Sequence, residues 1–172
     1  SIASMAGTEG ALIDEISDFI LTVRCGEETA GAKTKGFYCT KLNLTLFALQ
    51  LAKSYGRISA EDYAAEITQL EAYADHFLTI YEQSLQWVSQ NRENLAAAKD
   101  IRVIGTKEIY GDTLESALKL LETMRIPVTG YEFEEFVHGI YNAVNEDSTI
   151  IILDTGEEDR VETLINVLSD WT

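Results

Sequence analysis

The alternation of short apolar runs with helical segments constrains the fold of this chain more strongly than any other feature of its sequence. The run Thr-Ile-Ile-Ile-Leu at 149–153 is typical of a strand buried on both faces of a sheet, and Ile-Arg-Val-Ile at 101–104 predicts another strand. Helical spacing follows each run, at about 113–124 and at 160–168. This β-α-β-α order predicts a parallel sheet with right-handed crossovers, and so an α/β fold.

The segment between these two strands is less regular. Pro127 and Val128 lead into an expected loop of acidic and aromatic residues around Phe133, and a helical stretch that contains His138 follows it.

The first part of the chain has a similar organisation. The apolar run Phe-Ile-Leu-Thr-Val at 19–23 predicts a buried parallel strand, and Ile2 and Ala3 resemble the end of an earlier strand. A polar, glycine-containing loop at 26–36 comes next. Helical spacing, helix-forming composition and a terminating Gly56 then predict helices at 37–54, 59–90 and 92–99.

Two incomplete α/β lobes joined by helices are therefore the predicted architecture. Residues 1–56 would form the C-terminal part of a first lobe, 57–99 a helical linker, and 100–172 an incomplete second lobe. The chain opens inside a strand and closes on a helix, and a domain of this kind on its own would expose sheet edges. We expect the chain to be a fragment truncated at both ends, or to receive the missing elements from another chain.

Charge and composition exclude several classes of partner. The formal net charge is −16, which repels nucleic acid and disfavours anionic membranes. No apolar run approaches the roughly 20 residues that a membrane span needs. The two cysteines, Cys25 and Cys39, lack metal-ligand spacing, and no other cluster implies a metal or a cofactor. The reducing cytoplasm is the expected compartment.

A charged stripe lies on the predicted helix at 113–124. Glu115, Lys119 and Glu122 stand at i, i+4 and i+7, beside an apolar stripe that faces the core. Partial desolvation at such a boundary can shift the pKa of a carboxylate. A purely structural interpretation is equally available, with Glu115 and Lys119 as a stabilising pair and Asp112 and Glu115 as a capping box.

Two further sets of residues have the chemistry of a site. His138 follows Glu135 by about one helical turn, and an imidazole can accept or donate a proton near neutral pH. Thr34 and Lys35 lie in the polar loop near the start of a helix. A structural histidine and a solvated loop remain the alternatives.

Two motifs, in this order, are similar to those of the sugar isomerase (SIS) domain family. GEETAGAKTKGF from Gly26 resembles the family segment G-x-E-x-x-x-A-x-T-K-x-F, which precedes a long helix. Gly105, Tyr110, the run LESALKLLE from Leu114, and EFVHG from Glu135 resemble its second lobe. The similarity is greatest to the isomerase part of glutamine:fructose-6-phosphate amidotransferase and to fructosamine-6-phosphate deglycases. It implies lobes of three-layer, flavodoxin-like α/β/α structure.

The resemblance also implies roles for single residues. Glu122 would move a proton between C1 and C2 of an open-chain ketose phosphate, Lys119 would place positive charge near the enediol oxygen, and Glu115 would orient both. His138, contributed by the neighbouring subunit of a homodimer, would help to open the sugar ring. Thr34, Lys35 and Glu135 would contact the sugar phosphate. The phosphate loop of the family lies upstream of Ile2, so we expect this chain alone to bind phosphosugar poorly.

Three functions remain open at this level. The first is an aldose–ketose isomerase or a deglycase that acts on an amino-sugar or fructosamine phosphate. The second is a phosphosugar sensor without catalysis, and the third is a structural lobe that contributes to a dimer. The helix-turn-helix and basic face of a DNA-binding regulator are missing from this sequence, which disfavours that form of sensor.

Overall fold

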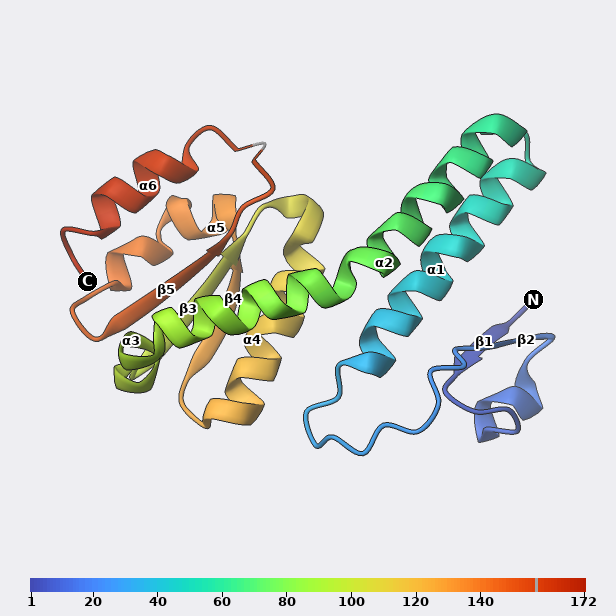
Figure 1. Ribbon diagram of the computed structural model, residues 1–172, viewed down its shortest axis with the longest axis horizontal. Helices are drawn as coiled ribbons and strands as arrows, with labels where there is room; N and C mark the ends of the chain where they lie inside the picture. Colours follow the sequence, from blue (N-terminus) through green and yellow to red (C-terminus); the bar gives the residue numbers. More distant parts are fainter. Residues whose placement is uncertain (157) are drawn as a thin grey trace. The chain divides into compact units, whose positions relative to one another are not determined.

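The computed structural model of the chain describes residues 1–156 and 158–172. These residues form two units, Ser1–Gln83 and Ser84–Thr172, whose helices and strands are coloured along the chain in Figure 1. The finer division into two lobes and a helical linker stays a prediction.

A three-stranded parallel sheet is the centre of the second unit. Strand β3 (Asp100–Gly105) lies between β4 (Val128–Glu132) and β5 (Ser148–Leu153), and both neighbours run parallel to it. Ile101 pairs with Val128 on one side and with Thr149 on the other. The parallel sheet predicted from the apolar runs is confirmed.

Helices cover both faces of this sheet. Successive residues of a strand point to opposite faces, so each strand contributes side chains to two separate cores. On one face, Ile101 and Val103 form a core with Ala117 of α4 (Tyr110–Met124). On the other face, Ile104 packs with Phe133 and Phe136 of α5 (Phe133–His138), and α6 (Val161–Leu168) completes that core. Figure 1 shows α4 on one side of the strands and α5 and α6 on the other. This is the expected α/β/α layering.

Strand β4 corrects the sequence prediction, which placed a loop at this position. Val-Thr-Gly-Tyr-Glu lacks a continuous apolar run, and its strand conformation comes from pairing with β3. The glycine has a packing role, because a Cβ at Gly130 would lie 3.1 Å from the carbonyl oxygen of Thr113 and 3.2 Å from Cα of Leu114. The missing side chain therefore allows α4 to approach the sheet closely.

The first unit combines a small sheet with long helices. Strands β1 (Ala3–Ala6) and β2 (Phe19–Thr22) are parallel, and the carboxylate of Asp14 between them accepts hydrogen bonds from Ser4 Oγ at 2.5 Å and from two backbone N–H groups at 3.0 Å. Helix α1 (Lys35–Ser54) follows, and α2 (Ala60–Gln90) runs on to the second unit, where α3 (Arg92–Ala97) begins. Short 3-10 turns lie at Leu12–Ile16, Lys107–Ile109 and Ile140–Ala143.

Burial in the first unit differs from the prediction. Strand β2 is parallel as expected, but its side chains Phe19 and Ile20 are 61% and 53% exposed. Neither α1 nor α2 has a buried residue, and α1 meets the residue after β2 through a hydrogen bond from Nδ2 of Asn43 to the carbonyl oxygen of Val23 at 3.2 Å. Over all the residues that the structure describes, no helix combines the length and the apolar character that crossing a membrane requires.

Candidate active site

The three charged side chains on α4 lie together as their spacing predicted. Nζ of Lys119 lies 2.7 Å from Oε2 of Glu122 and 3.5 Å from Oε1 of Glu115. The side chains of Lys119 and Glu115 are 21% and 23% exposed and that of Glu122 is 36% exposed, which places the three groups at the boundary between core and solvent. The stripe therefore joins two carboxylates through one ammonium group.

The prediction that the neighbouring apolar stripe faces the core is wrong for Leu114, Leu118 and Leu121, which are 44–45% exposed, and right for Ala117, which is buried.

The electrostatics of the stripe keep Lys119 charged. Its hydrogen bond to Glu122, together with the nearby carboxylate of Glu115, raises the pKa of Lys119 above its ordinary value. A permanent positive charge beside a carboxylate is suited to stabilising an oxyanion that develops next to the group that moves a proton. The predicted capping box is wrong, because α4 begins at Tyr110 and Asp112 lies inside its first turn.

His138 does not meet this stripe within one chain. It is the last residue of α5, and both it and Glu135 are exposed. Helix α5 packs on the face of the sheet that carries Ile104, whereas α4 packs on the face that carries Ile101 and Val103. The sheet thus separates the imidazole of His138 from the carboxylate of Glu122.

Thr34 and Lys35 belong to the first unit and are exposed. Their backbone N–H groups donate to the carboxylate of Glu28 at 2.7 and 2.8 Å. The ammonium group of Lys35 donates to the backbone carbonyl of Glu27 at 2.6 Å. The structure therefore links both predicted residues to an acidic pair that the sequence analysis did not select. The motif itself contained the signal, since Glu28 occupies its G-x-E position.

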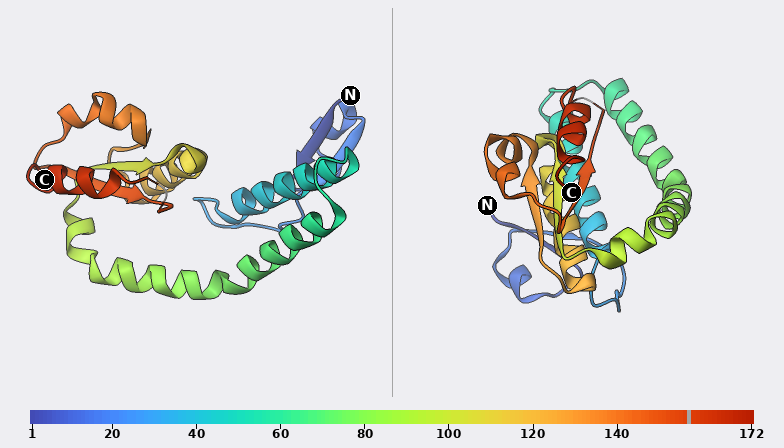
Figure 2. Two further views of the ribbon diagram at one scale, coloured as in Figure 1. Left: turned by 90° about the horizontal axis from the view of Figure 1, so that it is seen from above. Right: turned by 90° about the vertical axis from the view of Figure 1, so that its left-hand side faces the viewer.

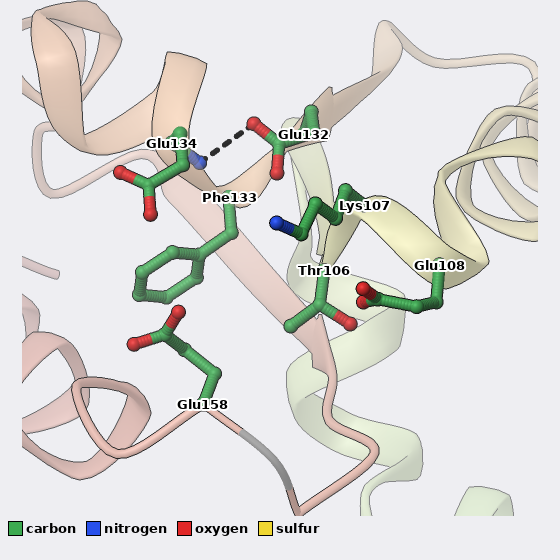
Figure 3. A pocket seen from close by; sticks show the side chains of 7 residues that line it. All are labelled: Thr106, Lys107, Glu108, Glu132, Phe133, Glu134 and Glu158. Atoms are coloured by element: carbon green, nitrogen blue, oxygen red, sulfur yellow. Dashed lines mark hydrogen bonds between the residues drawn. The ribbon is translucent and has the colours of Figure 1, made fainter.

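A pocket at the C-terminal edge of the three-stranded sheet was also missed. It has a volume of about 220 Å³ and lies beyond the ends of β3 and β4, as Figure 3 shows. After β3 the chain continues to α4 on one face of the sheet, and after β4 it continues to α5 on the other face. In open α/β proteins, ligands bind in the crevice that forms beyond the strand ends where the chain diverges in this way. Its lining comprises Thr106, Lys107, Glu108, Glu132, Phe133, Glu134 and Glu158.

Most carboxylates of this pocket already have partners in the protein. Glu132 caps α5 by accepting from the N–H groups of Glu134 and Glu135 at 2.8 and 3.2 Å. Arg160 binds Glu134 and also Glu158, with its Nε 2.7 Å from the latter. These hydrogen bonds lower the pKa of Glu134 and of Glu158 and raise that of Arg160. The ion pairs of Arg160 with Glu134 and Glu158 thus form a clamp, meaning that they connect α5 to the segment before α6.

Outside residue 157, no three histidine, cysteine or acidic side chains are grouped in a way that could hold a metal ion.

Comparison with known proteins relates the chain to aminotransferases. No family model matches it. It is 30% identical over 151 residues to the glutamine–fructose-6-phosphate aminotransferase (isomerizing) of Bartonella henselae, which covers 88% of this chain and 25% of that protein. The enzyme of the same name from Neisseria meningitidis serogroup A is 32% identical over 148 residues, or 84% of this chain and 23% of the enzyme. The chain thus spans about a quarter of the length of these curated relatives.

Solved structures agree in fold. A candidate phosphosugar isomerase from Clostridium difficile 630 is 64% identical, with a TM-score of 0.96 over 100% of this chain and 49% of that one. A candidate sugar-binding protein from Salmonella typhimurium LT2 is 43% identical, with a TM-score of 0.88 over 99% and 51%. The C-terminal domain of the aminotransferase from Francisella tularensis, at 20% identity, shares the fold with a TM-score of 0.86 over 98% and 47%. The chain therefore resembles the SIS domain family and, within it, the isomerase part of the glutamine–fructose-6-phosphate aminotransferases.

Proposed function

We propose that the protein containing this chain is a phosphosugar enzyme, either an aldose–ketose isomerase or a deglycase that acts on an amino-sugar or fructosamine phosphate. The observation that carries the proposal is the stripe on α4, where Lys119 is held between Glu115 and Glu122 at the edge of the core. The similarity to a candidate phosphosugar isomerase along the whole chain supports it.

The proposed reaction is a proton transfer between neighbouring carbons of the open-chain sugar. Glu122 removes the proton from one carbon, an enediolate forms, and the same carboxyl group returns the proton to the other carbon while the hydroxyl proton passes from one oxygen to the other. The ammonium group of Lys119 stabilises the negative charge that develops on the enediol oxygen, and Glu115 orients this ammonium group. Proton transfer by a positioned carboxylate contributes about 100- to 10,000-fold to a rate.

His138 acts in this scheme from a second copy of the chain. The imidazole cannot reach Glu122 of its own chain through the sheet, so ring opening by His138 requires a homodimer in which each site borrows the partner's ring. Thr34, Lys35 and Glu135 are the proposed contacts to the sugar phosphate. No metal or other cofactor takes part, and the cytoplasm remains the expected compartment.

The test compares the full-length wild type with Glu122→Gln on fructose 6-phosphate, glucosamine 6-phosphate and fructosamine 6-phosphates. We expect turnover of at least one substrate and a fall in kcat of about 100-fold or more in the variant. Glu162→Gln is the matched control, because Glu162 is an exposed glutamate on α6, away from the stripe. Equal turnover in the wild type and in Glu122→Gln would refute the role of Glu122.

A sensor that binds phosphosugar without turnover is the second candidate. The 43% identity to a candidate sugar-binding protein favours it. Calorimetry that detects binding of these sugar phosphates, together with no product in any assay, would select the sensor over the enzyme.

A further inference from the structure

The loop at 26–36 is closed by the carboxylate of Glu28. Oε1 of Glu28 accepts hydrogen bonds from the N–H groups of Thr34 at 2.7 Å and Lys35 at 2.8 Å, and Oε2 accepts from Gly36 at 2.9 Å. The side chain of Lys35 folds back to the carbonyl oxygen of Glu27. Two consecutive glutamates thus hold the two ends of the loop together.

These three N–H groups form the amino-terminal end of α1. The first N–H groups of a helix lack partners in the helix, and the helix dipole adds partial positive charge there. In many proteins such an end binds a phosphate group. Here a carboxylate of the same chain takes that place, and its hydrogen bonds to Gly36 and Thr34 lower the pKa of Glu28, so it stays ionised at neutral pH.

Gly36 fits closely against this carboxylate. A Cβ on Gly36 would lie 3.3 Å from Oε2 of Glu28, which is a tight contact. With a side chain here, the carboxylate of Glu28 would have to shift by a few tenths of an ångström, so the glycine leaves it room beside the helix end.

We propose that Glu28 is a positioning residue, which holds Thr34 and Lys35 for the substrate and reserves the amino-terminal end of α1 for itself. The sugar phosphate is then recognised by side chains of this loop, and the N–H groups of the helix end take no part in binding it. The substrate part of this inference rests on the proposed function, whereas the closure of the loop does not.

Hydrogen exchange tests the closure independently of any activity. The full-length wild type, Glu28→Ala and Glu27→Ala are compared at the amides of Thr34, Lys35 and Gly36. Glu27 is the matched control, since only its backbone carbonyl takes part in the closure. We expect at least about tenfold faster exchange of these amides in Glu28→Ala alone. Equal exchange in all three proteins, or equal acceleration in both variants, would overturn the closure and the positioning role with it.

Kinetics with the best phosphosugar substrate test the positioning. Glu28→Ala should raise KM at least about tenfold with kcat within about twofold of the wild type, since the chemistry belongs to α4. In Glu28→Ala, sodium acetate, compared with sodium chloride at equal ionic strength, should lower the raised KM. Acetate would bind at the amino-terminal end of α1, where the carboxylate of Glu28 is missing. An unchanged KM, a loss confined to kcat, or a raised KM that acetate leaves unaltered would overturn the positioning role. A wild type that neither binds nor converts any phosphosugar refutes the proposed function and this role together, while the exchange result still decides the closure.

Discussion

At Gly105, the last residue of β3, a side chain has no room. A Cβ there would lie 2.0 Å from Oγ1 of Thr113, which is itself fully buried and donates a hydrogen bond to the carbonyl oxygen of Ile109 at 3.0 Å. The pair joins the end of the strand to the first turns of α4. This crowded contact is one of the points at which the helix that carries Glu115, Lys119 and Glu122 is anchored to the sheet.

Gly105→Ala should lower the free energy of unfolding by at least about 2 kcal/mol, because it overpacks this point. The control is Gly111→Ala in the same helix, where a Cβ meets nothing within 4 Å, and there we expect a gain of about 0.5–1 kcal/mol from helix propensity. Urea unfolding measures both. Adding Thr113→Ala should recover part of the loss at Gly105, and strictly additive losses would contradict a direct clash.

Lys119 supports a second prediction at this scale. Its pKa is raised, so the positive charge and its contribution to the stripe are present below the ordinary value of 10.5 and are lost only as pH rises through the higher value in the folded protein. The pH profile of kcat should therefore show no alkaline loss from this group below 10.5. Lys119→Met should lower kcat at all pH values, and Lys119→Arg should retain part of it. A profile in Lys119→Arg equal to that of Lys119→Met would show that charge at this position is not what matters.

At the scale of elements, Arg160 connects the start of α5 to the segment before α6. It binds Glu134 and Glu158, and its guanidinium lies 5.1 Å from the centre of the Phe133 ring. Both carboxylates have a pKa below the ordinary value of 4.5. Their stabilising contribution is therefore present above 4.5 and is lost as pH falls through the lower values in the folded protein.

Arg160→Met should lower Tm at pH 7, and the difference from the wild type should shrink as the pH falls below 4.5. Thermal unfolding followed by circular dichroism between pH 3 and 7 measures this. Arg92→Met is a suitable control, since Arg92 begins the short helix α3, away from this clamp. A difference in Tm that stays constant down to pH 3 would show that Arg160 stabilises through packing and not through its ion pairs.

At the scale of the whole molecule, the sheet of the second unit separates the two groups on which the proposed chemistry depends. The stripe lies on one face and His138 on the other, so a shared site needs two chains. The exposed apolar side chains Leu114, Leu118 and Leu121 on α4, each 44–45% accessible, lie beside the charged stripe. If another chain packed against these leucines, the charged stripe of α4 would lie close to the surface of that chain.

Complementation tests this arrangement. Glu122→Gln and His138→Ala chains, each with greatly reduced activity alone, are co-expressed at equal amounts. If each site takes Glu122 from one chain and His138 from the other, about a quarter of wild-type activity returns, since half of the dimers are mixed and each holds one intact site. Dimers in which both chains carry the same variant give the background activity. Activity that stays at this background would place both groups in one chain, and full activity of His138→Ala alone would place His138 outside the reaction.

Local patterns in the sequence were sufficient for much of this protein. The apolar run at 149–153 predicted β5, and the spacing of Glu115, Lys119 and Glu122 predicted their stripe, because strand and helix periods place side chains on faces without knowledge of distant residues. Only the tertiary structure decided what depends on contacts between distant segments. Pairing with β3 made 128–132 a strand, the two faces of the sheet separated Glu122 from His138, and three hydrogen bonds placed Glu28 at the end of α1. The physical reason is that strand pairing, the packing of layers and helix capping join residues far apart along the chain. The local period of a helix or strand carries no information about such contacts.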